Sequence, residues 1–303
     1  MLADFGYTVP MLERDLALTL AGGGNRAFYQ AGLLNRWAER LLPRVRVIAS
    51  CSAGACVATV FLAGRSAATN EFWKQRRAGV TRNLDWRKLL VGQRPAPHGE
   101  VYRDTMMFAM RDGGLERLRQ QPFPILVLTT GWPHWLPTTP AMLLGMAAYN
   151  LEKRLYPARV HPQFGRRLGF IPIVFDARDC ETPEQLADLI LASSASPPFT
   201  PVGRFGGQRL LDGGLVDNAP AFLADQIAGV RRHLIMLTRP YPDGVLGRHG
   251  DHLYVGPTHA TPISRWDYTR PDLLDATIAM GERESETHSA RLDALLADGD
   301  GNG

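Results

Sequence analysis

Three short segments, far apart in the chain, carry residue types that together could cleave an ester. Ser52 lies among small residues, Gly22, Gly23 and Gly24 follow one another, and Asp212 precedes two further glycines. A serine hydroxyl becomes a nucleophile when a base removes its proton. Backbone amides of a glycine loop can bind the oxyanion that then forms. The segments therefore predict a serine acyl hydrolase, provided that one fold brings them together.

The residues around Ser52 predict a sharp turn between a strand and a helix. The run at 47–50 is β-rich, and the stretch Ala53–Ala63 is apolar on nearly all sides, as in a buried helix. Small residues such as Gly54 allow the strained backbone that presents a nucleophile, and the positive end of the helix favours negative charge there. Ser50 replaces the first glycine of the G-x-S-x-G pattern. The alternative is a tight turn in which Ser52 merely caps the helix.

The glycine loop follows the apolar run Leu16–Leu20, which reads as a buried strand, and a helix is expected from about Arg26 to Arg40. In this setting the amides of Gly22, Gly23 and Gly24 can converge on an anion. Arg26 could orient the loop or add positive potential. A nucleotide phosphate is the competing ligand, but the segment lacks the Lys-Ser/Thr ending of a P-loop and the dinucleotide spacing. A plain tight turn is the remaining alternative.

Asp212 ends a β-rich run and is followed by Gly213 and Gly214, so a carboxylate is expected beside a backbone turn. An aspartate with a pKa of about 3.9 is a weak base, so burial or the neighbouring serine must tune it. Asp217 is the second choice for the catalytic carboxylate. We instead expect Asp217 and Asn218 to cap the next helix, because a proline follows closely.

Strand-like and helix-like runs alternate, which predicts an α/β fold with a central, mostly parallel sheet and helices on both faces. Thr182 is expected to cap a helix that ends near residue 192, with Gln185 completing a capping box. A long loop is expected over 244–262. The chain is predicted to be one domain, residues 1–303, with a lid or insertion at about 132–168 and a C-terminal helical extension at about 266–297. Further strands are expected at 45–50, 124–129, 170–175, 209–211 and 233–237, and further helices from residue 139 and over about 273–296.

The composition and charge of the chain limit the kinds of partner that it could bind. The 303 residues are 45% hydrophobic, ample for a large core, and the net charge is +4. Basic residues cluster only in arginine pairs at 76–77, 166–167 and 231–232, so no nucleic-acid partner is expected. These pairs are either solvated surface or contacts to an anionic lipid surface. Three cysteines without ligand spacing predict no disulfide framework, no metal and no cofactor. With no apolar run long enough to span a bilayer, a cytoplasmic protein with at most peripheral membrane contact is expected.

Taken together, the segments resemble the patatin-like phospholipases, and the resemblance covers about Asp15 to Leu237. It implies a patatin-like three-layer sandwich that hydrolyses lipid esters through a Ser52–Asp212 dyad without histidine. It also implies an acyl-enzyme intermediate and an oxyanion hole made by the glycine loop near Arg26. Ser50 and Ala27 replace glycines that the family commonly carries. The matching residues are Gly22-Gly23-Gly24-Asn25-Arg26, Ser52-Ala53-Gly54, Asp212-Gly213-Gly214, and the stretches 192–199 and 216–220.

Two other functions fit the same sequence. His233, His252 and His259 follow Asp212, which matches the Ser…Asp…His order of an esterase that acts on small esters. A non-catalytic lipid-binding module is the second alternative. Its lid or membrane-facing surface would consist of Trp132, Trp135, Leu136 and the Met/Leu-rich helix from Ala141, residues that could equally belong to the core.

Overall fold

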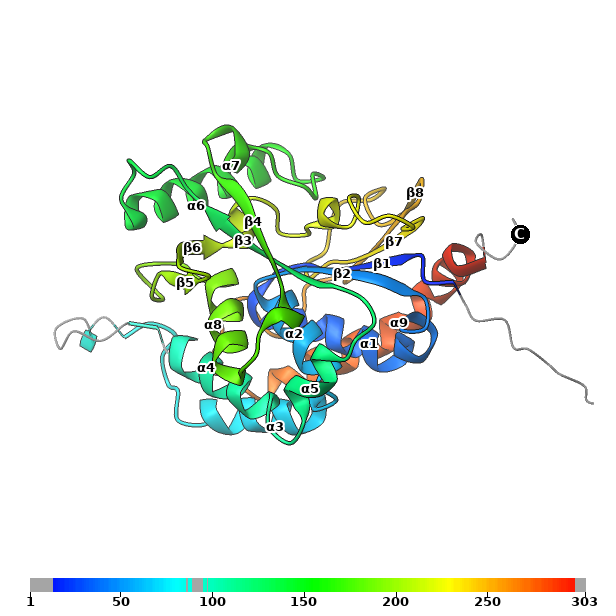
Figure 1. Cartoon of the computed structure of the whole chain (residues 1–303), viewed down its shortest axis with the longest axis horizontal. Helices are drawn as coiled ribbons and strands as arrows, with labels where there is room; N and C mark the ends of the chain where they lie inside the picture. Colours follow the sequence, from blue (N-terminus) through cyan, green and yellow to red (C-terminus); the bar gives the residue numbers. More distant parts are fainter. Residues whose placement is uncertain (1–12, 86, 89–94, 97, 298–303) are drawn as a thin grey trace, which may run out of the picture.

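The computed structural model describes residues 13–85, 87–88, 95–96 and 98–297. Residues 1–12 and 298–303 of the predicted domain therefore lie outside the description. A sheet crosses the centre of the molecule, and helices cover both of its faces (Figure 1). The helices α6 and α7 lie on one face, and α1, α2 and α9 lie on the other. The chain is thus an α/β three-layer sandwich, as the sequence predicts.

The strands follow the predicted alternation, with additional short strands late in the chain. They are β1 (Leu16–Leu20), β2 (Val45–Cys51), β3 (Ile125–Gly131), β4 (Ile171–Asp176), β5 (Gly203–Phe205), β6 (Gln208–Asp212), β7 (Arg232–Met236), β8 (Gly247–His249) and β9 (His252–Val255). The α-helices are α1 (Phe28–Leu41), α2 (Ala53–Leu62), α3 (Ser66–Arg77), α4 (His98–Ala109), α5 (Gly114–Arg119), α6 (Thr138–Leu155), α7 (Phe164–Arg167), α8 (Pro183–Ser193) and α9 (Leu273–Ala297). Short 3₁₀ helices include η1 (Gly24–Ala27), η3 (Ala177–Asp179), η4 (Gly213–Leu215) and η5 (Ala221–Leu223).

The sheet has a parallel centre and antiparallel edges. The described strands run in the order β5-β6-β3-β2-β1-β7-β9-β8, with β4 also paired to β3. The pairs β3–β2, β2–β1, β1–β7 and β7–β9 are parallel, and the outer pairs are antiparallel. In such a sheet the carboxyl ends of the central strands meet at one edge, where ligands usually bind. The turns after β1 and β2 therefore lie side by side.

Side-chain alternation along β1 explains the layers. Leu18 belongs to the large core that includes Trp37 of α1, whereas the adjacent Ala17 packs with Ala224 on the opposite face. Successive side chains of a strand point to opposite faces, so a wholly apolar strand needs cover on both. All five residues of β1 are buried. Because β1 is buried along its whole length, the turn that follows it is anchored to a rigid strand.

The long C-terminal helix α9 packs directly against α1, and two glycines allow this contact. A side chain at Gly32 would overlap the carbonyl oxygen of Ile278, and one at Gly281 would overlap the carbonyl oxygen of Tyr29. The Tyr29 hydroxyl donates a 3.0 Å hydrogen bond to Glu284. The predicted C-terminal extension is therefore tied to the first helix of the fold.

The predicted loop over 244–262 is wrong in part, because it contains the antiparallel hairpin of β8 and β9. Leu253 and Val255 are buried while His252 and Tyr254 are less so, which is the alternation of a short strand. The surrounding Gly, His and Pro residues obscured this pattern in the sequence. The hairpin extends the sheet beyond β7.

Thr182 caps α8 as predicted, with its hydroxyl accepting a 3.2 Å hydrogen bond from the Gln185 amide. The other half of the predicted capping box differs. The Gln185 side chain accepts from the amide of Glu181, one residue before the cap, at 2.7 Å. Pro183 at the first helical position fixes the backbone for this start. Among the described helices, none is both long and apolar enough to cross a membrane.

Candidate active site

Ser52 stands on a strained turn between β2 and α2. Its backbone has φ 52° and ψ −127°, a left-handed region that residues other than glycine rarely occupy. Its amide donates a 2.7 Å hydrogen bond to the Ser193 hydroxyl. A side chain at Gly54 would overlap the carbonyl oxygen of Leu20, so this glycine lets α2 approach the end of β1. Such strain is typical of positions where a nucleophile is presented.

The fold brings Ser52 and Asp212 together. Ser52 Oγ lies 3.4 Å from Asp212 Oδ2 and also 3.4 Å from Ser194 Oγ. The other carboxylate oxygen of Asp212 accepts a 2.7 Å hydrogen bond from the Gly214 amide. The distance from serine to aspartate exceeds that of a usual O–H···O bond, as is common for catalytic pairs without substrate. The two predicted residues, 160 positions apart in sequence, therefore share one buried site.

Burial controls the charge of the Asp212 carboxyl. Asp212 is only 4% exposed, and loss of hydration raises its pKa above the usual value. The positive charge of Arg265, the Gly214 amide and the Ser52 hydroxyl act in the opposite direction but do not reverse the shift. A carboxylate with a raised pKa is a stronger base than an ordinary aspartate. The structure thus shows the raised pKa that Asp212 would need in order to act as a base.

The glycine loop is clamped by two side chains from distant segments. Gly22 donates its amide to the Asn218 carbonyl at 2.8 Å, and its carbonyl accepts from Asn218 Nδ2 at 2.7 Å and from Thr238 Oγ1 at 2.8 Å. Within the described part of the chain, the amides of Gly23 and Gly24 donate to no acceptor. Gly24 has φ +57°, which favours glycine. These two amides are free to bind an anion, whereas that of Gly22 is already engaged.

Arg26 closes the loop from its helical side. Its Nε donates a 3.3 Å hydrogen bond to the Gly23 carbonyl. The next contact comes from the segment after β9, where the Arg265 carbonyl accepts from the Asn25 amide at 3.1 Å. Sequence reasoning missed Arg265, because nothing local distinguishes it within a loop far from the other motifs. The loop is therefore held on three sides, by Asn218, by Arg26 and by Arg265.

Two pockets meet at Ser52 and Asp212. The first encloses about 790 Å³ of space, part of it open to solvent, and its lining includes Ser52 and Gly24. The second encloses about 410 Å³ and its lining includes Asp212. Arg265 and Trp266 line both. The first pocket is mostly apolar, with walls that include Phe28, Val57, Val60, Phe61, Trp73 and Tyr102.

Asp217 and Asn218 do not cap a helix as predicted. Asp217 instead accepts from the Ala219 amide at 2.9 Å and lies 2.9 Å from His161 Nδ1. Asn218 holds the glycine loop. Only the short helix η5 begins nearby, and its cap residue Pro220 makes no side-chain hydrogen bond to it. The proline therefore marks a turn here rather than the start of a long helix.

Two serines that were not assigned roles also lie in the site. Ser193 Oγ, which accepts from the Ser52 amide, donates a 2.6 Å hydrogen bond to the Leu128 carbonyl. Ser194 contacts the Ser52 hydroxyl itself. Both belong to the small-residue stretch noted in the sequence, but only the fold shows their contacts. Ser50, in place of a glycine, is accommodated because its hydroxyl donates to the Leu126 carbonyl at 3.0 Å.

The histidines of the alternative triad lie elsewhere. His233 pairs with Ala17 near the start of β1, and His252 pairs with His233 in the next strand. Ala17 pairs with Val47 of β2, and β2 ends four residues later at Cys51, just before Ser52. At about 3.3 Å per strand residue, the Ser52 turn lies about 13 Å or more from this level of the sheet. His259 is exposed and lies 3.0 Å from Thr258. Among the described residues, no histidine hydrogen-bonds to Ser52 or Asp212.

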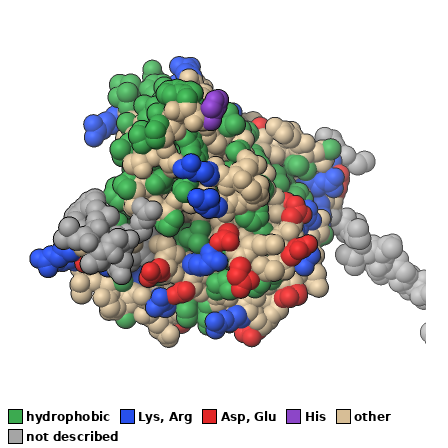
Figure 2. Space-filling view, turned by 60° about the vertical axis from the view of Figure 1, so that its left-hand side comes forward, with side chains coloured by type: hydrophobic (Ala, Val, Ile, Leu, Met, Phe, Trp, Pro, Cys, Tyr) green, Lys and Arg blue, Asp and Glu red, His purple; other side chains and the backbone are tan. Residues whose placement is uncertain are grey.

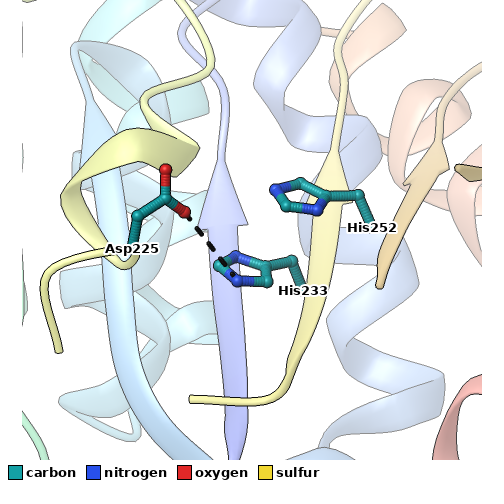
Figure 3. A group of neighbouring side chains, drawn as sticks. All are labelled: Asp225, His233 and His252. Atoms are coloured by element: carbon teal, nitrogen blue, oxygen red, sulfur yellow. Dashed lines mark ion pairs between the residues drawn. The ribbon is translucent and has the colours of Figure 1, made fainter. Parts of the chain in front are cut away.

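Asp225, His233 and His252 face one another at that opposite end of the sheet (Figure 3). His233 Nε2 lies 3.8 Å from Asp225 Oδ1, and the two imidazole rings stack 4.1 Å apart with an interplanar angle of 4°. Their possible ligand atoms lie within 4.8 Å of one another. In parallel stacked rings, however, the nitrogen lone pairs lie in separate planes and do not converge on one ion. The group is therefore a stacked histidine pair beside a carboxylate.

Comparison with known proteins places the chain in a family. A family model described as patatin-like phospholipase matches residues 18–225, which is more than half of the chain. This span contains the glycine loop, Ser52 and Asp212. The protein belongs to the patatin-like phospholipase family. Among curated proteins, none matches its sequence.

Comparison with solved structures finds proteins similar to this chain at low sequence identity. VipD from Legionella pneumophila is 13% identical with a TM-score of 0.46, over 95% of this chain and 67% of that one. Human GIVD cytosolic phospholipase A2 is 11% identical with a TM-score of 0.42, over 94% and 63%. ExoU of Pseudomonas aeruginosa, solved with SpcU, is 15% identical with a TM-score of 0.38, over 95% and 53%. The chain thus spans about two thirds or less of each of these proteins.

Proposed function

We propose that the protein is a serine acyl hydrolase that cleaves carboxylic ester bonds of lipids through Ser52 and Asp212. The observation that carries this proposal is the 3.4 Å separation of Ser52 Oγ and Asp212 Oδ2 in a buried site. Membership of the patatin-like phospholipase family supports the reaction class. The free amides of Gly23 and Gly24 beside the nucleophile support the same chemistry.

The reaction proceeds in two halves. Asp212 accepts the proton of the Ser52 hydroxyl while Oγ attacks the ester carbonyl carbon. The oxyanion binds the amides of Gly23 and Gly24, each donor lowering the barrier by about 2.7–4 kcal/mol. Collapse of this intermediate breaks the ester C–O bond, and the leaving alcohol takes the proton from Asp212. Water, deprotonated by Asp212, then attacks the acyl-enzyme, and the fatty acid leaves as Ser52 recovers its proton.

The two pockets suit different parts of the substrate. The first pocket has an apolar wall and contains Ser52, so it suits the acyl chain. The second contains the carboxylate that must protonate the leaving alcohol, so it suits the alcohol portion. An ester whose carbonyl lies between Ser52 and the glycine loop would reach both. This division suits a lipid, because an acyl chain would contact the apolar wall of the first pocket.

An exposed apolar surface on α6 suits contact with a lipid layer. Leu143, Leu151 and Leu155 are 52%, 51% and 57% exposed, and Trp135 before the helix is 72% exposed. Hydrophobic side chains gather at the upper end of the molecule in Figure 2, where α6 and α7 lie in Figure 1. Trp132, also in the predicted lid, instead packs against the core beneath. We propose that this surface makes peripheral contact with a membrane and that residues 132–168 act as the lid.

Replacement of either dyad member tests the proposal. Ser52→Ala should reduce hydrolysis of a medium-chain acyl ester to background, and Asp212→Asn should reduce kcat by about 10²–10⁴-fold, the usual contribution of a general base. Ser264→Ala and Asp243→Asn, both at exposed positions, serve as matched controls. Unchanged turnover in either dyad variant would refute the mechanism.

The two alternatives give different results. An esterase triad predicts that His233→Ala, His252→Ala or His259→Ala removes activity, whereas the dyad predicts normal turnover in a fold that remains intact. A lipid-binding module predicts that the native protein sediments with liposomes yet cleaves no lipid in a panel of acyl esters. Each comparison uses the same folded protein, with circular dichroism as the check on structure.

A further inference from the structure

Four cationic residues belong to segments that contact the glycine loop or line the second pocket. Arg26 lies at the end of the loop itself. Arg239 follows Thr238, whose hydroxyl donates a 2.8 Å hydrogen bond to the loop. Arg265 accepts from the Asn25 amide at 3.1 Å through its carbonyl and lines both pockets. Three segments that are distant in sequence thus bring an arginine to the same place.

The fourth cation comes from α6. Tyr149 and Asn150 of this helix line the second pocket. Lys153 follows them by four and three residues, which places it on the same face of the helix, one turn further along. The second pocket is therefore lined by Arg265 and by the face of α6 that also carries Lys153.

None of these cations has an acidic partner. Across the described ranges of the chain, no ion pair uses Arg26, Lys153, Arg239 or Arg265. All four side chains are half-buried, and Arg265 Nε is fully buried without a hydrogen-bond acceptor. Unpaired cations away from water are costly unless an anion compensates them. Asp212 is the carboxylate of the second pocket, and one carboxylate does not balance four positive charges.

The four charges act on one another. Burial, and then the charges of Arg239, Arg26 and Arg265, lower the pKa of Lys153 to about 8. Burial, and then Arg265 and Arg239, lower the pKa of Arg26 to about 10. This repulsion agrees with the positions of the four residues on segments that meet at the glycine loop and the second pocket. A bound anion would relieve it.

We propose that Arg26, Lys153, Arg239 and Arg265 form a binding site for the head group of a glycerophospholipid that carries phosphate and no cationic end. This inference rests on the proposed function, with the acyl chain in the first pocket and the head group at the second. Phosphate oxygens match the planar fork of arginine and the point charge of lysine. A choline or ethanolamine end would instead add a fifth positive charge to the region.

Short-chain lipids below their micelle concentration test this proposal without an effect of surface charge. We compare kcat/KM for dihexanoyl phosphatidylglycerol and dihexanoyl phosphatidylcholine, which share acyl chains and differ in head-group charge. The native protein should prefer the glycerol lipid by roughly 10- to 100-fold, the range expected for one or two charge-assisted hydrogen bonds. Lys153→Gln and Arg265→Gln should each reduce that preference by roughly 10-fold. Equal values in the native protein would overturn the proposal.

A matched control separates the site from overall charge. Arg154→Gln removes one positive charge at the neighbouring, exposed position of α6. It should keep the native preference, and a loss as large as that of Lys153→Gln would overturn the proposal in favour of a general charge effect. Raising the salt concentration should lower the preference in the native protein, because screening weakens the attraction.

Binding measurements distinguish failure of this site from failure of the catalytic proposal. Titration calorimetry on Ser52→Ala protein gives dissociation constants for the two lipids without turnover. Tighter binding of phosphatidylglycerol that is lost in Ser52→Ala/Lys153→Gln would support the head-group site even if the native protein cleaved neither lipid. Equal binding of both lipids would overturn it even if the native protein cleaved both.

Discussion

At the scale of single residues, the site depends on what burial does to Asp212. The carboxyl group lies beside Ser52 in a region from which water is largely excluded, so its pKa is raised. The same burial brings Arg265 close enough to favour the charged form. The pKa of Asp212 is therefore set mainly by loss of hydration, which outweighs the opposing effects of Arg265, the Gly214 amide and the Ser52 hydroxyl.

This balance predicts the acidic side of the pH profile. Asp212 must be ionised to accept the serine proton, so kcat/KM for a soluble ester should fall as the pH drops through its raised pKa. The midpoint should lie above about 3.9, the value of a free aspartate. Arg265→Gln should move it higher, because the positive charge that favours the carboxylate is lost. A midpoint at or below that of free aspartate, or a downward shift in Arg265→Gln, would contradict this account.

At the scale of elements, the site is assembled by turns whose positions the sheet fixes. The glycine loop follows β1 and the Ser52 turn follows β2, and these strands are adjacent and parallel. Asn218 then connects the loop to the segment after η4 (Gly213–Leu215). A rigid sheet edge and several cross-links to the loop thus hold Ser52 next to the free amides of the glycine loop.

Asn218→Ala should loosen the glycine loop. It removes the 2.7 Å hydrogen bond to the Gly22 carbonyl but leaves that from Thr238. We expect a loss of about 1 kcal/mol in the free energy of unfolding, typical of one hydrogen bond. The kcat should fall by roughly 10-fold, since misplaced oxyanion donors weaken transition-state binding. Denaturant melts and steady-state kinetics measure both, and native kcat in this variant would contradict the role of Asn218.

The contact between α1 and α9 gives a prediction about stability. Gly281→Ala places a methyl group against the backbone of Tyr29, so it should lower the free energy of unfolding by about 1–3 kcal/mol. Gly79→Ala is the matched control, because its added methyl would meet nothing within 4 Å. Thermal unfolding should show a melting temperature lower by several degrees only in the first variant. Equal melting temperatures in the two variants would show that α1 and α9 can move apart to accept the methyl group without loss of stability.

Elements with strong local patterns could be predicted, and contacts between distant segments could not. The apolar run at β1 and the small residues around Ser52 each determine a local structure, and both have the predicted form. The hairpin of β8 and β9 was missed because only two residues of β9 are buried. An alternation this short cannot be recognised among the surrounding glycines and histidines. Arg265 could not be predicted from the sequence. Its contact with the glycine loop depends on the path that residues 256–272 take through the fold.

At the scale of the whole molecule, the second pocket lies next to an exposed apolar surface of α6. One face of α6 lines the second pocket through Met142, Met146 and Tyr149, while Leu151 and Leu155 point to solvent. The same helix thus lines the second pocket and carries the exposed leucines proposed to contact lipid. This arrangement would deliver a membrane lipid to the dyad without a long passage through water.

Polar substitutions on that surface test the membrane contact. Leu151→Ser combined with Leu155→Ser should reduce sedimentation with liposomes several-fold, because each exposed leucine contributes about 25 cal/mol per Å² that it buries in lipid. Hydrolysis of a soluble ester should be unaffected, since both side chains point away from the pockets. Leu84→Ser, at another exposed leucine, provides the control. Sedimentation equal to that of the native protein would place the membrane surface elsewhere.

The most direct test of the central claim is mass spectrometry of the protein after treatment with a fluorophosphonate, which bonds covalently to an activated serine hydroxyl. The account predicts one adduct, on the peptide that contains Ser52, and its loss in Ser52→Ala. It also predicts much slower labelling in Asp212→Asn, because the base that activates the hydroxyl is removed. A protein that remains unlabelled, or an adduct on a different serine, would contradict the assignment of Ser52 as the nucleophile.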